Sequence, residues 1–117
     1  MGVVKNFDQP DETRTFDRGR LDIVEVHGQR VGRAVFEPEW RWSESVRPIA
    51  GTDSCQVEHL VYVVSGKLGV SYDDGSLQEI RAGALAHLPA GHDAWTVGTT
   101  ACVVIDFMGA PSYAVET

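Results

Sequence analysis

The chain has 117 residues, 43% of them hydrophobic, and a formal net charge of −7. This length predicts a single domain with one core, and the acidic balance argues against nucleic acid or an anionic membrane surface as a partner, because both select basic patches. The N-terminus lacks the basic start and apolar run of a signal peptide, and no apolar run is long enough to span a bilayer. Two distant cysteines make no disulfide framework, so the sequence predicts a cytoplasmic protein with reduced thiols.

The first twenty residues are polar and rich in turn formers, with Phe7 and Phe16 as the large apolar anchors. We expect residues 1–20 to form an arm that lies on the domain, and residues 21–117 to form the domain itself. Residues 21–26 alternate loosely and end at His27-Gly28, a turn signal, so they predict a hairpin with the following apolar residues.

Residues 57–64 predict the central strand of the domain. Its apolar side chains fall on both faces, with Val61 and Val63 on one and Tyr62 and Val64 on the other. A strand that is apolar on both faces is covered on both. We therefore expect one face to meet the core and the other to meet a second copy of the chain, in a homodimer.

Three potential metal ligands come just before this strand or at its start. Asp53, Cys55 and His59 occupy odd positions, as do the inward valines. Because strand side chains repeat with period two, the three side chains are predicted to project the same way if the strand extends back to them.

The second half of the chain is divided by regular turn signals. Asp73-Asp74-Gly75 indicates a tight hairpin, Pro89-Ala90-Gly91 a further turn, and residues 101–107 a last apolar strand. Turn signals recur roughly every 8–12 residues, and no stretch has helical periodicity, which is typical of an all-β sandwich or barrel. The segment between Trp40 and Gly51 is predicted to be a loop.

The order of these features resembles the small single-domain cupins of RmlC-like type, which are antiparallel jelly-roll β-barrels. The resemblance covers roughly residues 31–108 and lies in Tyr62-Val-Val-Ser-Gly66, the Asp-Asp-Gly hairpin, the spacing of Gly83, Pro89 and Gly91, and the final apolar strand. It implies an all-β jelly-roll fold, and many cupins are homodimers.

The metal-ligand positions of the cupin motifs hold different residue types here. Asp53 and Cys55 stand where the family has a His-x-His pair, and His59 stands where it has glutamate. Ala94 occupies the usual position of the second-motif histidine, while His92 lies two residues earlier on the same strand face. The resemblance therefore implies that Cys55, His59 and His92 converge inside the barrel.

Thiolate and imidazole ligands suit a divalent transition metal, namely zinc, iron or nickel, better than magnesium or calcium. We assign Cys55, His59 and His92 as the candidate metal ligands, and His59 and His92 also as candidate catalytic residues. Asp53 is the weakest member, because its loop favours a turn former. In the alternative interpretation Cys55 is a small buried hydrophobe and His59 a hydrogen-bonded core histidine.

Trp40, Trp42 and His87 are the candidate residues of a substrate pocket. The two tryptophans share a face, and their alternative role is packing over the barrel mouth or at a dimer contact. His87 lies two residues before Pro89, and its alternative placement is the outer surface of the sheet.

The sequence thus leaves open whether the protein is an enzyme. One hypothesis is a small cupin that acts on a small organic molecule through a metal-supported site. The second is a non-catalytic cupin that binds a small ligand or serves as a sensor without metal. The third is metal-free acid–base catalysis by His59 or His92, which needs only an imidazole that titrates near neutral pH.

Overall fold

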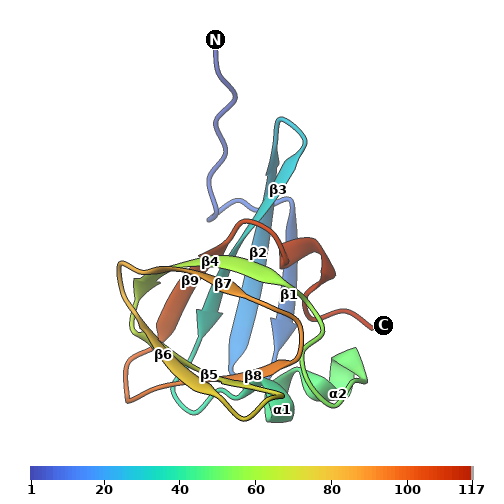
Figure 1. The fold of residues 1–117 in the computed structure, drawn as a ribbon. Coiled ribbons are helices and arrows are strands. Elements are labelled where there is room, and N and C mark those ends of the chain that lie inside the picture. The colour runs from blue at the N-terminus through green and yellow to red at the C-terminus, as the bar shows by residue number, and fades with distance from the viewer. Residues whose placement is uncertain (117) are drawn as a thin grey trace.

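The computed structural model describes residues 1–116, which form two antiparallel sheets that curve around a common interior (Figure 1). The larger sheet has the strand order β1-β2-β3-β9-β4-β7, and the smaller one has the order β6-β5-β8. The strands are β1 (Glu12–Phe16), β2 (Gly19–Val26), β3 (Gln29–Phe36), β4 (His59–Ser65), β5 (Lys67–Tyr72), β6 (Leu77–Arg81), β7 (Leu85–Leu88), β8 (His92–Thr96) and β9 (Cys102–Asp106). This arrangement confirms the predicted all-β antiparallel fold of jelly-roll type.

The predicted hairpins are present, and their turns have the expected backbone geometry. His27 and Gly28 join β2 to β3 with φ values of 51° and 77°, which is the pattern of a tight hairpin turn with two left-handed residues. The second hairpin joins β5 to β6 through the Asp73-Asp74-Gly75 turn, where Asp74 Oδ1 accepts the Ser76 backbone N–H at 2.9 Å. Local turn chemistry therefore fixes both registers.

Gly66 carries the chain from the larger sheet to the smaller one. It lies between β4 and β5 with φ 76°, and a Cβ atom here would collide with the carbonyl oxygen of Ala101. Only glycine combines this backbone conformation with such a close approach. The turn lets β4 and β5 lie on opposite sides of the interior.

The segment from Trp40 to Gly51 differs from the predicted loop. It forms two four-residue helices, α1 (Trp42–Ser45) and α2 (Arg47–Ala50), and Gly51 ends the second one in the left-handed conformation. Helices of one turn are too short to show a periodic apolar pattern, so the sequence did not reveal them. None of the described helices has the length and apolarity needed to cross a membrane.

The first twenty residues contribute a strand to the larger sheet. β1 pairs antiparallel with β2 at the edge of the sheet, and Phe16 at its end is buried in the core. Before it, the Phe7 ring lies 5.5 Å from the Arg33 guanidinium of β3, while the first residues extend away from the domain (Figure 1).

Aromatic rings fill one end of the interior. Phe36 and Trp40 are stacked with ring centroids 3.9 Å apart, and Phe16 meets Tyr113 edge-on at 5.9 Å. Such pairs add to the stability gained from burying their large apolar surfaces. Tyr113 follows the short 3₁₀ helix η1 (Ala110–Ser112), so the C-terminal tail supplies part of the core.

Arg14 of β1 fastens this tail to the sheet. Its Nη1 donates to the carbonyl oxygens of Ala110, Pro111 and Tyr113 at 3.1, 2.9 and 2.8 Å. Its Nε pairs with Glu12 at 2.7 Å, which fixes the guanidinium in place. These bonds hold Tyr113 in the interior.

We expect Arg14→Met to lower the free energy of unfolding by about 2 kcal/mol, because three carbonyl groups lose a charged donor. Urea denaturation would measure the change. The matched control is Arg18→Met, since Arg18 is exposed and makes only longer ion pairs with Asp17 and Glu39. Equal stability of the Arg14 and Arg18 variants would show that the tail does not depend on Arg14.

Candidate functional site

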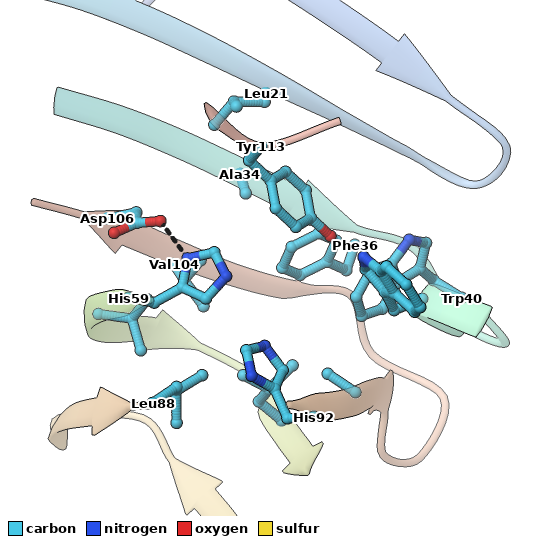
Figure 2. A pocket seen from close by; sticks show the side chains of 14 residues that line it. Leu21, Ala34, Phe36, Trp40, His59, Leu88, His92, Val104, Asp106 and Tyr113 are labelled. Atoms are coloured by element: carbon cyan, nitrogen blue, oxygen red, sulfur yellow. Dashed lines mark hydrogen bonds and ion pairs between the residues drawn. The ribbon is translucent and has the colours of Figure 1, made fainter. Parts of the chain in front are cut away.

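A small cavity lies between the two sheets, with a volume of about 40 Å³. Its wall is almost wholly apolar and includes the aromatic rings of Phe36 and Trp40 (Figure 2). Trp42 also lines it. Polar groups enter it from His59, His92, Asp106 and Tyr113. A space of this size has room for a ligand of a few non-hydrogen atoms.

Cys55, His59 and His92 come together beside this cavity, as the sequence predicts. Their ligand atoms all lie within 4.8 Å of one another, and all three residues are buried. Cys55 Sγ is 3.7 Å from His59 Nε2, and the two imidazole rings have their centroids 5.3 Å apart. The structure thus places one thiol and two imidazoles in a single cluster.

The three residues reach the cluster from different elements. His59 begins β4 and shares its inward face with Val61 and Val63, while His92 begins β8 directly after the Pro-Ala-Gly turn. Cys55 is not part of β4, because residues 56–58 are outside any strand. It is placed instead by a backbone bridge to His92, in which Cys55 N–H donates to His92 O at 2.7 Å.

Each imidazole is oriented by a hydrogen bond from its outer nitrogen. His59 Nδ1–H donates to Asp106 Oδ2 at 2.6 Å (Figure 2), and His92 Nδ1–H donates to the Pro89 carbonyl oxygen at 2.7 Å. A carbonyl oxygen and an ionised carboxylate only accept, so Nδ1 carries the proton in both rings. The Nε2 atom of each ring is therefore left for the cluster or the cavity.

Asp106, at the end of β9, was not predicted from the sequence. Its Oδ1 accepts the backbone N–H groups of Met108 and Gly109 at 3.1 and 3.0 Å, so the whole carboxylate is fixed. Burial would raise the pKa of Asp106, but the hydrogen bonds from His59 and from these backbone groups lower it below its ordinary value. The alternation of side chains along β9 could have indicated Asp106, since Cys102, Val104 and Asp106 share the inward face of this strand.

Gly109 permits the close packing around the His59 ring. A Cβ atom at this position would lie 2.5 Å from His59 Nδ1 and 2.5 Å from the Glu58 carbonyl oxygen. Any side chain here would push the imidazole away from Asp106, because real Cβ contacts are longer than this.

The pairing reverses the usual charge states of the thiol and the imidazole. Burial alone would raise the pKa of Cys55, but hydrogen bonds with His59 and His92 outweigh it and lower the pKa from 9.0 to about 6. Burial would lower the pKa of His59, but Asp106 and Cys55 raise it from 6.5 to about 9. Without a metal ion, the pair is a thiolate and an imidazolium at neutral pH.

The candidate pocket residues have different positions. Trp40 and Trp42 are buried in the cavity wall. His87 does not reach the cavity: it is exposed on β7, and its Nε2 lies 2.8 Å from Glu58 Oε2. The next residue, Leu88, takes the inward position on that strand.

Asp53 lies outside the cluster, and Tyr113 lines the cavity although the sequence analysis did not single it out. The Asp53 side chain is exposed and pairs with Arg47 at 3.1 Å, outside the cluster. Tyr113 is a cavity residue that no motif or periodicity indicated, because it comes from the short tail. Burial holds the pKa of Tyr113 well above its ordinary value, so its hydroxyl stays protonated.

Comparison with known proteins identifies the fold. No family model matches the sequence, and no curated protein matches it either. An RmlC-like cupin from Shewanella frigidimarina superposes with a TM-score of 0.54 at 20% identity, covering 80% of this chain and 78% of that chain. The Drosophila melanogaster CENP-C cupin domain gives 0.51 at 13% identity, covering 74% and 69%.

The oxalate decarboxylase of Lactobacillus farciminis, solved as a formate complex, gives a TM-score of 0.63 at 16% identity. The match covers 97% of this chain but only 35% of the decarboxylase, so this chain spans about a third of that protein. At these identities the similarity is one of fold. The chain has the small cupin fold, which confirms the resemblance seen in its motifs.

We expect the Cys55 thiol of metal-free protein to titrate near pH 6, well below the ordinary value for cysteine, because His59 and His92 stabilise its thiolate. The ultraviolet absorbance of the thiolate, followed against pH, measures this. Cys102 does not interfere, since burial raises its pKa to about 11.

His59→Gln is expected to move the Cys55 titration to higher pH, because burial then acts with less opposition. Unchanged titration in this variant would contradict the thiolate–imidazolium pair.

Proposed function

We propose that this protein is a small metal-dependent cupin that holds a divalent transition metal at Cys55, His59 and His92 and acts on a small organic molecule in the adjoining cavity. One observation carries the proposal. Both imidazoles donate to an outer acceptor through Nδ1, so Nε2 is the atom that could bind a metal ion. Metal-ligating histidines almost always show this arrangement.

The residues of the cluster fit zinc, iron or nickel. Bonds of about 2.3 Å to sulfur and about 2.05 Å to nitrogen, at a tetrahedral angle, place the two ligand atoms about 3.6 Å apart. The Cys55 Sγ to His59 Nε2 distance is 3.7 Å. Three protein ligands leave a further coordination position for a substrate, and the ion would supply Lewis acidity toward a substrate oxygen.

The chain's own residues would supply positioning and exclude water. Asp106 holds His59 against rotation through a 2.6 Å hydrogen bond, and the Pro89 carbonyl does the same for His92. Trp40 and Trp42 close the cavity beside the cluster. His87 takes no part in this proposal, since its side chain lies on the outer surface.

A second candidate function is metal-free catalysis in which His59 acts as a general base. It is favoured by the series Cys55, His59 and Asp106, in which the thiol faces Nε2 and the carboxylate binds Nδ1. This order of nucleophile, base and orienting acid supports covalent catalysis in other proteins. Metal content separates the two candidates, because only the first requires an ion. A non-catalytic ligand-binding cupin would bind a ligand without turnover.

The surroundings of the protein are also part of the proposal. Both cysteines are free thiols, which supports a reducing compartment such as the cytoplasm.

The outer face of β4 and β7 exposes Tyr62, Val64 and Leu85, which supports a homodimer that covers these side chains.

We expect protein purified without chelators to contain close to one transition-metal ion per chain. His59→Ala should lose most of this metal, because a ligand is removed from the centre of the cluster. Elemental analysis measures both. His87→Ala is the matched control, since it removes an exposed histidine outside the cluster and should leave the metal content unchanged.

Asp106→Asn provides a graded test of the same site. It keeps all three ligands but weakens the orientation of His59, so the metal affinity should fall about 10- to 100-fold. Full metal content in the His59 variant would exclude the proposed ligand set.

The dimer is tested by light scattering at micromolar concentration. We expect twice the mass of one chain, and Tyr62→Lys with Leu85→Lys should convert it to monomer, because two charges would then be buried at the contact. A monomeric wild-type protein would contradict the proposal.

A further inference from the structure

Trp40 brings an unsatisfied hydrogen-bond donor to the cavity wall. The residue is 1% exposed and is stacked on Phe36, with its indole among the groups that line the cavity. Its Nε1–H is buried and has no acceptor among residues 1–116. Buried indole N–H groups usually have a partner, and an unpaired one costs free energy. A ligand with an acceptor atom would remove that cost.

Tyr113 adds a second donor at the same end of the cavity. Tyr113 lines the cavity, and Figure 2 shows its hydroxyl directed toward Phe36 and Trp40. Both groups are donors in a wall that is otherwise apolar at this end. An acceptor atom of a ligand would satisfy the Trp40 donor.

The charges at the other end favour a neutral ligand. The described residues that line the cavity include the Asp106 carboxylate but no lysine or arginine. The Asp106 carboxylate is already paired with His59. An anionic ligand would therefore meet a carboxylate without a lysine or arginine to pair with.

We propose that the cavity binds a small neutral carbonyl compound whose oxygen accepts the Trp40 Nε1–H. This inference rests on the proposed function in one respect, since it names the substrate class of the same site. The volume of about 40 Å³ limits the ligand to a few non-hydrogen atoms. The apolar wall contacts its carbon atoms, and the cluster lies beside it.

The test uses acetone and isobutene, which have the same shape and differ in whether an oxygen is present. The chain has three tryptophans, so the indole N–H signals in a proton–nitrogen NMR spectrum are few enough to assign. We expect acetone to move the Trp40 indole proton downfield in metal-free protein, as a new hydrogen bond requires, and isobutene to cause no downfield shift. The same shift with both compounds, or none with acetone, would overturn the inference.

Two variants give an independent measurement. Trp40→Phe removes the donor, so acetone affinity relative to isobutene should fall about tenfold, the effect of roughly 1.4 kcal/mol. Trp95→Phe is the matched control, since Trp95 is not among the described residues that line this cavity and its loss should leave this ratio unchanged. An unchanged ratio in the Trp40 variant would contradict the assigned donor. If a variant fails to fold, the wild-type NMR comparison still decides the matter.

Two further results separate this inference from the metal proposal. A protein that binds no zinc but shows the acetone shift would overturn the metal site and support the carbonyl site. A protein that binds zinc and shows no acetone shift, in either metal state, would overturn the carbonyl site alone. Acetate is the charge control: a Trp40 shift with acetate and not with acetone would overturn the choice of a neutral ligand.

Discussion

The hydrogen bond between His59 Nδ1 and Asp106 Oδ2 is the interaction on which the rest of the site depends. It is 2.6 Å long and joins β4 to the neighbouring strand β9. The carboxylate is fixed by backbone donors on its other side, so the imidazole can turn only one nitrogen to the interior. This constraint fixes the orientation of His59 and turns its Nε2 toward Cys55.

The same contacts also lower the free-energy cost of burying the polar groups of the cluster. A thiol, two imidazoles and a carboxylate lie within an apolar core, where an unpaired charge would be very costly. Each of them has a partner: Asp106 accepts from His59, His59 faces Cys55, and His92 donates to the Pro89 carbonyl. The polar groups therefore remain in the interior at a tolerable cost, and their free nitrogen and sulfur atoms stay directed at one small volume.

Sequence patterns predicted the structure correctly where it depends on local turn chemistry or on the alternation of side chains along a strand. The His27-Gly28 and Asp73-to-Gly75 turns fixed two hairpins, and the register of the cupin motifs brought Cys55, His59 and His92 together. Other contacts depend on tertiary packing, which leaves no local signal. Asp106 looks like an ordinary polar strand end, Tyr113 lies in a tail without periodicity, and α1 and α2 are each a single turn. His87 was assigned to the pocket from its place two residues before Pro89. The next residue, Leu88, takes the inward position instead.

X-ray absorption spectroscopy of zinc-loaded protein tests the metal centre most directly, because it counts ligands by element and distance. A shell of one sulfur at about 2.3 Å and two imidazole nitrogens at about 2.0–2.1 Å is expected, with the sulfur absent in Cys55→Ser. A zinc shell made only of oxygen and nitrogen in the wild-type protein would contradict the assignment of Cys55 and, with it, the metal centre proposed for this fold.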